Sequence, residues 1–446
     1  MYFPLYLLFI FFVIVSYYYS TSNGKLFLLI LIIYTISAAC SILYVYSDFF
    51  SNSNKYNTNL NYLPFVFWII SFFLISRPII YYDRKKTNGL LVNVRLFEYA
   101  SLIGLIMGIP PLIDMVPQIT KVFYASNLTS TISELHDDET VSINFSALGL
   151  ICFRIINSIY QFFLFCAIPI LMTPNRKRIY IIGLLIVVID VNLASLLTGS
   201  RSVMINTIID FALLYLLFCP FFDKKISHAI NTYLLLMTGA SVILFLIITI
   251  FRGLGYQEND SKDLLTFLIQ YVGEGFVNFH LYIDNIREYN HGNQCFWVFK
   301  NIMGLDVPNI KGEAGLRYLY QLHIGIPAMV FYTFIGFFVI DIGPLGTLIF
   351  FFLLSQIVQN ITKNSIGSKK IVPTHTLFLL YIYASIIANG TCLYKYSWKE
   401  SIHIIYYVFI YFILKYNNFN LIFFKSSNNK NQNEYSINNT NKEFNY

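Results

Sequence analysis

The sequence predicts an all-α polytopic integral membrane protein with about 11 transmembrane helices, a large external loop and a re-entrant or interfacial element. Of its 446 residues, 57% are hydrophobic and only 12% are charged, whereas a soluble globular domain carries about a quarter charged residues. Apolar runs of roughly 17–25 residues recur along the chain, and each can cross a hydrocarbon core of about 30 Å as a helix. A closed β-barrel would instead show alternating segments of about ten residues.

The apolar runs define the predicted spans in chain order. They lie near residues 2–19, 26–46, 62–82, 96–117, 147–172, 179–198, 203–221, 229–251, 341–361, 374–391 and 401–416. The first run lacks a basic n-region, and it ends in three tyrosines rather than at a small-residue cleavage site. We therefore expect it to be retained as a span and not removed as a signal peptide.

Four parts follow from these spans. They are transmembrane helices 1–8 in residues 1–251, an external loop with a re-entrant element in 252–340, transmembrane helices 9–11 in 341–416, and a disordered cytoplasmic tail in 417–446. The tail prediction rests on the segment from Lys425 to Tyr446, which is rich in Asn, Ser and Lys. Such a segment cannot bury enough apolar surface to order itself.

Basic residues in short loops predict the orientation in the membrane. Clusters that should all face the cytoplasm are Arg84, Lys85, Lys86 and Arg95, then Arg176, Lys177 and Arg178, then Lys224 and Lys225, and finally Lys363, Lys369 and Lys370. A full crossing by residues 326–340 would place the last cluster outside. That segment is short for a span and contains Pro327 and Gly336, so we favour a re-entrant or interfacial element there.

An arginine in a tight turn between two apolar runs is the first candidate binding residue. The turn, SLLTGSR, ends at Arg201. It could present this side chain, the hydroxyls of Ser200 and Ser202 and the amides of the next helix to one anion. Arg252 lies at the same predicted level, where the external loop begins. A snorkelling arginine at the interface is the alternative. Two arginines at one depth favour an anion site, and a lipid-linked diphosphate is the anion expected at that height.

The external loop holds the candidate catalytic residues. A helix is predicted from Leu264 to Asn285, with a polar stripe formed by Tyr271, Glu274, Asn278 and Tyr282. Glu274 lies between two glycines, which would leave its carboxylate open to a substrate as a general base. A solvated carboxylate on an amphipathic helix is the alternative. His280 and His323 are further candidate bases, and Asp341 could cap the following span or hold a substrate hydroxyl.

The sequence lacks the motifs that are typical of nucleotide-binding, metal-binding and nucleic-acid-binding proteins. The chain has no P-loop, no nucleotide-binding βαβ unit and no Asp-x-Asp pair beside a soluble domain. Its six cysteines show no metal-binding spacing, and no basic block indicates nucleic acid. We therefore expect no metal, no cofactor and no nucleic-acid partner.

Four motifs carry a resemblance to a known family. TGSRS after an apolar helix, FRG at the start of the loop, GEGFVNFHLY within it and YTFIGFFVIDIGPLG before the next span resemble the Wzy-type oligosaccharide repeat unit polymerases, over residues 190–354. The amino-terminal spans match this family only in hydropathy. The resemblance implies a multi-pass protein of the bacterial inner membrane. Its expected activity is metal-independent glycosyl transfer on the periplasmic face, which joins undecaprenyl-diphosphate-linked repeat units into O-antigen or capsular polysaccharide.

The resemblance also implies roles for the candidate residues. Arg201 and Arg252 match the family's arginines, but the resemblance assigns no general base. Our hypothesis from the residues themselves is that these arginines and Arg317 bind the donor diphosphate, while Glu274, or else one of the two histidines, accepts the acceptor's proton. Expected partners are the lipid-linked oligosaccharide, membrane lipid, a chain-length regulator and a flippase. A lipid-linked oligosaccharide flippase and an O-antigen ligase are the alternative functions. A flippase would carry charges at mid-membrane depth and an internal repeat.

Overall fold

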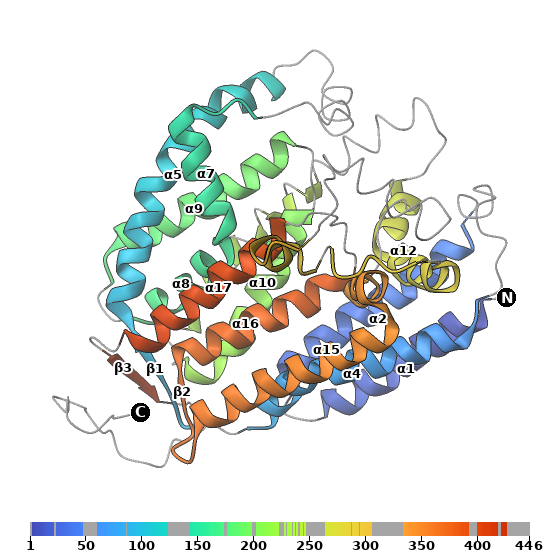
Figure 1. Cartoon of the computed structure of the whole chain (residues 1–446). Coiled ribbons are helices and arrows are strands. Elements are labelled where there is room, and N and C mark those ends of the chain that lie inside the picture. Colours follow the sequence, from blue (N-terminus) through green and yellow to red (C-terminus); the bar gives the residue numbers. More distant parts are fainter. Residues whose placement is uncertain are drawn as a thin grey trace.

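The fold is a bundle of long helices with a small sheet at one end (Figure 1). The computed structural model describes residues 2–21, 24–47, 60–85, 87–123, 143–173, 176–198, 202–222, most of 227–246, 264–286, 288–293, 295–305, 333–391, 399–417 and 421–425. Within these ranges nearly all residues outside short connections are helical.

Helices form at the predicted spans that the structure describes in full. They are α1 (Phe3–Ser20), α2 (Lys25–Val45), α4 (Tyr62–Arg84), α5 (Val94–Phe123), α9 (Arg178–Leu197), α10 (Ser202–Phe218), α15 (Phe334–Ile366), α16 (Thr374–Ala388) and α17 (Lys399–Tyr416). The predicted span 147–172 forms two helices, α7 (Ala147–Ser158) and α8 (Tyr160–Met172), which are bent by 69°. The end of predicted span 229–251 lies outside the described residues.

Length and composition identify a helical multi-pass membrane protein. Among the described residues, seven helices are long and apolar enough to cross a membrane, or eight when the bent pair α7–α8 counts as one span. The prediction of about 11 spans is therefore confirmed only for this smaller set. Exposed leucine, isoleucine and valine side chains cover the outer faces of these helices, as lipid-facing surfaces require.

The sheet joins three connections that are distant in the sequence. Strand β1 (Gly89–Asn93) lies between α4 and α5, and it pairs in parallel with β2 (Ile371–Pro373) and antiparallel with β3 (Leu421–Lys425). The backbone amide of Asn88 also donates to the carbonyl of Lys370 at 2.8 Å. The connections after α4, after α15 and after α17 therefore meet at one end of the bundle, which is the arrangement that the predicted orientation requires.

Strand β3 corrects the prediction for the tail. Residues 417–446 were expected to be disordered, but Leu421–Lys425 pair with β1 along its whole length. The sequence LIFFK has the apolar and aromatic character of an edge strand, and the ring of Phe423 lies over Gly89, where no side chain obstructs it. Residues beyond Lys425 lie outside the described part of the chain.

Helix α15 begins earlier than predicted and is broken by a glycine. It starts at Phe334 rather than near residue 341, and Gly343 has φ 78° and ψ 167°, a conformation that favours glycine. A Cβ at Gly343 would also lie 3.2 Å from the ring of Tyr289. Residues 334–340 are helical and mostly buried, whereas 326–332 lie outside the described residues. The re-entrant element therefore stays a prediction.

Small residues let α5 and α9 approach closely. Gly104 and Gly108 face α9 from α5, and a Cβ at Gly108 would lie 2.4 Å from the Ile186 side chain. On α9, a Cβ at Gly183 would lie only 2.2 Å from the carbonyl oxygen of Ser101. Helix pairs in membranes use such small-xxx-small surfaces because packing replaces the hydrophobic driving force between helices.

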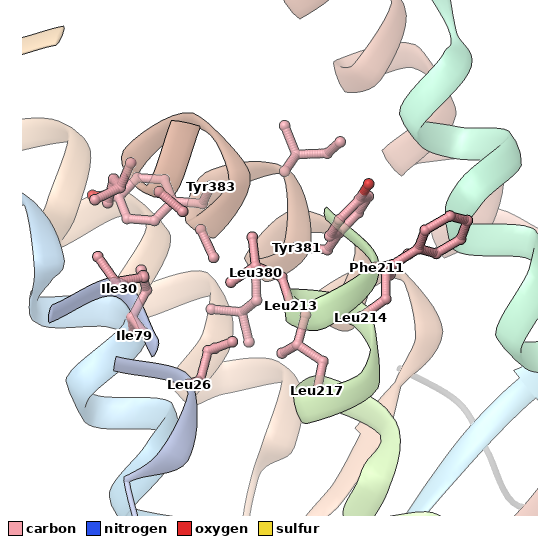
Figure 2. Close-up of a cluster of buried hydrophobic side chains, with 14 of the residues drawn as sticks. Leu26, Ile30, Ile79, Phe211, Leu213, Leu214, Leu217, Leu380, Tyr381 and Tyr383 are labelled. Carbon is pink, nitrogen blue, oxygen red and sulfur yellow. The ribbon is translucent and has the colours of Figure 1, made fainter. Parts of the chain in front are cut away.

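Apolar side chains from four helices fill the centre of the bundle. Figure 2 shows Leu26 and Ile30 of α2, Ile79 of α4, four residues of α10 and three of α16 packed together. Two tyrosine hydroxyls connect these helices by hydrogen bonds to backbone carbonyls. The hydroxyl of Tyr34 donates to Ile387 at 2.8 Å, and that of Tyr383 donates to Ile75 at 2.6 Å. Helices α2, α4, α10 and α16 thus form one packed unit.

The α5–α9 crossing gives a first testable prediction. Gly183→Ala should destabilise the protein by about 1–3 kcal/mol, because the new methyl group meets backbone that cannot rotate away. The measurement is the thermal midpoint of the detergent-solubilised protein. Gly239→Ala is the matched control, since no described atom lies within 4 Å of its added Cβ, and alanine alone favours a helix. Equal midpoints for the two variants would contradict the close crossing.

Candidate functional site

Helix α12 (Leu264–Asn285) crosses the end of the bundle opposite the sheet (Figure 1). Its bounds are those predicted from the sequence. Gly273 contacts Cys40 near the end of α2, and Gly275 contacts Thr391 in the short 3₁₀ helix η2 (Asn389–Thr391) that follows α16. The helix thus contacts the ends of α2 and α16 that lie away from the sheet.

Glu274 is buried on this helix. Only 2% of its surface is exposed, and the side-chain amide of Gln270 donates to Oε2 of Glu274 at 3.1 Å. Asn278 and Tyr282, from the same predicted stripe, are 3% and 1% exposed. The stripe therefore faces protein rather than water, and the alternative of a solvated carboxylate is wrong.

The glycines beside Glu274 make helix contacts rather than an opening. A Cβ at Gly273 would lie 2.4 Å from the Cys40 carbonyl, and one at Gly275 would lie 2.4 Å from the Thr391 carbonyl. The Ser37 hydroxyl also donates to the carbonyl of Val272 at 2.9 Å. The expectation that the glycines leave space for a substrate is corrected, because protein backbone occupies that space.

His280 lies on α12 and is buried against the start of α4. It has no exposed surface, its ring stacks on Phe65 with centroids 5.5 Å apart, and its Nε2 accepts the backbone N–H of Asn61 at 2.6 Å. Asp284 lies 3.4 Å from the same nitrogen. Since Nε2 is an acceptor, the ring is neutral with its proton on Nδ1. Burial lowers the pKa of His280, and Asp284 opposes this shift. Its role as a base stays a prediction.

Asp341 of α15 holds the segment that follows α12. Its Oδ2 accepts the backbone N–H of Cys295 at 2.7 Å, and its carbonyl accepts that of Gly292 at 3.0 Å. The N-cap of α15 is Thr333, whose hydroxyl accepts from Gly336. Gly343 breaks α15 two residues after Asp341, so the expected capping of the following span and the contact with a substrate hydroxyl both stay predictions.

Sequence reasoning missed a buried carboxylate inside the bundle. Asp210 of α10 is 1% exposed, and it accepts from the Ser385 hydroxyl and from the side-chain amides of Gln161 and Asn389, both at 3.2 Å. Gln161 also donates to the Ser385 hydroxyl at 2.6 Å. This Asp210 network connects α8, α10, α16 and η2.

Asp190 of α9 is a second buried acid that was missed. It has no exposed surface, and neither carboxylate oxygen has a hydrogen-bond partner among the described residues. The sequence could have indicated both residues, because Asp190 and Asp210 are each the single acidic residue of an apolar span. Ionisable residues within a span are costly and commonly functional.

Arg201, Arg252, Arg317 and His323 lie outside the described residues, so the convergence of the arginines on one anion stays a prediction. In the described part of the chain, no group of three or more His, Cys, Asp or Glu side chains could hold a metal ion. Of the predicted set, the structure places Glu274, His280 and Asp341.

Comparisons with known proteins give no relative. No protein-family model matches the chain, and neither a curated protein nor a solved structure matches it.

The Asp210 network gives a second prediction. Asp210→Ala should destabilise the protein by about 2 kcal/mol or more, because it leaves buried amide and hydroxyl donors without their acceptor. Asp210→Asn keeps one acceptor oxygen and should cost less. Thermal midpoints in detergent measure both effects. Glu288→Ala, at a side chain that is 64% exposed, is the control and should leave the midpoint unchanged. A midpoint for Asp210→Ala equal to that of the control would exclude the network as a stabilising feature.

His280 gives a third prediction. Its pKa is lower in the folded protein than its ordinary value near 6.5, so the unfolded state binds the proton more tightly. Stability is therefore complete above about pH 6.5 and falls as the pH drops through the folded pKa. His280→Gln keeps an acceptor for Asn61 and should lose less stability between about pH 7.5 and pH 5.5 than the wild type. His291→Gln, at a side chain that is 70% exposed, should keep the wild-type dependence.

Proposed function

We propose that the protein is a metal-independent glycosyltransferase of the bacterial inner membrane that polymerises undecaprenyl-diphosphate-linked oligosaccharide repeat units on the periplasmic face. The observation that carries the proposal is Glu274, a buried carboxylate on a helix at the end of the bundle opposite the sheet. The sheet end carries the loops that are rich in lysine and arginine. Under the positive-inside rule, this arrangement supports an external position for α12.

The proposed reaction needs one base and a cationic site for the leaving group. The acceptor hydroxyl attacks the anomeric carbon of the donor sugar, the bond from that carbon to the diphosphate oxygen breaks, and Glu274 takes the hydroxyl proton. Arg201, Arg252 and Arg317 bind the diphosphate, which leaves on its lipid carrier, and stabilise its developing charge. His280 and His323 are the alternative bases.

The contacts around Glu274 suit this role. Gln270 orients the carboxylate through Oε2, and the serine contacts with α2 hold the helix backbone in place. Asp341 fixes the turn that contains Gly292 and Cys295, so its substrate contact would come from the same end of the bundle. A base must be held within hydrogen-bond distance of the group it deprotonates, and rigid support provides this.

A flippase is the second candidate because of the two acids inside the spans. Asp190 and Asp210 are buried within α9 and α10, and intramembrane carboxylates are typical of ion-coupled transporters. The two functions differ in where the substrate accumulates. Loss of a polymerase leaves single repeat units on the external leaflet, whereas loss of a flippase leaves them on the cytoplasmic leaflet. Loss of an O-antigen ligase would remove all surface glycan.

The fourth prediction concerns polymer length. In a strain that lacks the gene, complementation with Glu274→Gln should lower long-chain polymer by about 10²–10⁴-fold, because the amide cannot accept the proton. Arg201→Ala should lower it by about 10²–10³-fold through loss of charge stabilisation. The measurement is the electrophoretic banding pattern of the surface glycan. Single-unit glycan and protein level in the membrane should be unchanged.

Matched variants test whether the loss of polymer comes from the reacting groups rather than from a general effect of the substitution. Glu288→Gln removes an exposed carboxylate just after α12 and should give normal banding. Arg201→Lys keeps the positive charge and should retain part of the polymer. Normal chain length in both Glu274→Gln and Arg201→Ala would exclude the proposed reaction centre.

A further inference from the structure

A groove between α4 and α15 carries three basic residues that the proposed function does not use. Its volume is about 360 Å³, and its walls are Arg77, Ile80, Tyr81, Arg84, Lys85 and Gln359. All except Gln359 lie on α4 or directly after it. Because β1 follows α4 closely, the groove lies at the sheet end of the bundle, away from α12.

The basic residues occupy successive depths on one face of α4. Arg77, Tyr81 and Arg84 are spaced by four and three residues, so they share a face. The two arginines are about 10 Å apart along the helix axis. Arg77 thus lies within the apolar span, and Arg84 is its last residue. Both arginines are exposed on the surface of the bundle.

No carboxylate neutralises these charges among the described residues. Arg84 donates to the Tyr19 hydroxyl at 3.4 Å, and the Lys85 ammonium lies 5.4 Å from the centre of the Tyr81 ring. The adjacent acid, Asp83, instead accepts the backbone amide of Phe27 at 2.7 Å, at the start of α2. An arginine within a span is costly unless an anion compensates it.

We propose that this groove binds the phosphate headgroup of an anionic phospholipid. Guanidinium groups bind phosphate oxygens in a bidentate manner, and basic residues at the membrane surface attract anionic lipids. Ile80 and the ring of Tyr81 give the groove an apolar floor, which suits the glycerol ester region of a lipid. A soluble phosphate would satisfy the arginines but would gain nothing from that floor.

The test is lipid binding by the full chain in detergent. Native mass spectrometry measures retention of phosphatidylglycerol against phosphatidylcholine, and the thermal midpoint measures the stabilisation by each lipid. The wild type should prefer phosphatidylglycerol, and Arg77→Gln/Arg84→Gln should bind it at least about tenfold more weakly. Arg77→Lys/Arg84→Lys should retain part of the affinity.

The matched control removes the same charge elsewhere. Lys177→Gln/Arg178→Gln changes two exposed cations at the start of α9 and should keep wild-type binding. Equal losses in the two double variants would overturn the proposal, because they would show attraction to total charge alone. Equal stabilisation by inorganic phosphate and by phosphatidylglycerol would also overturn it in favour of a soluble anion.

A measurement on the wild type does not depend on the folding of variants. A photoactivatable phosphatidylglycerol should label peptides around residues 77–85 more strongly than a phosphatidylcholine analogue does. Labelling that is equal for the two lipids, or that is absent from this segment, would overturn the proposal.

Discussion

A carboxylate inside a membrane bundle has little water to bind, so the surrounding helices must supply its hydrogen-bond donors. Asp210 obtains its donors from α8, α16 and η2, and this requirement fixes η2 against α10. The same short helix ends at Thr391, whose carbonyl contacts Gly275 of α12. Through the three residues of η2, this polar network therefore contributes to the position of α12, which α2 also holds.

Close approach of backbones is the second constraint, and it explains where the glycines occur. Lipid is as apolar as a leucine side chain, so helices in a membrane associate by packing and by hydrogen bonds. At Gly183 the α5 backbone occupies the space of a side chain, and at Gly273 the α2 backbone does the same. The close approach also lets hydroxyl groups of one helix bind backbone carbonyls of the next. The Ser41 hydroxyl of α2, for example, donates to the carbonyl of Gly273 in α12 at 2.5 Å.

Hydropathy predicted the fold class and most helix positions because apolar length is a property of each segment alone. The bounds of α12 followed equally from its period. The burial of Glu274 did not, because a polar stripe on an amphipathic helix looks the same whether it faces water or protein. The bend before Tyr160 and the pairing of Leu421–Lys425 depend on contacts between distant segments. Asp210 was predictable in principle, as a single acid in an apolar span.

The two candidate functions place opposite demands on the contacts of α12. A general base needs its helix held in one position, within hydrogen-bond reach of the reacting hydroxyl. A flippase needs its helices to separate so that a lipid headgroup can pass. Hydrogen bonds from Ser37 and Ser41 join α12 to α2, and His280 joins it to the segment before α4. Separation would remove these partners from the buried Ser37 hydroxyl and from Nε2 of the buried His280, at about 1–3 kcal/mol each. The attachment of α12 to α2 and to the segment before α4 therefore fits the proposed general base better than the flippase alternative.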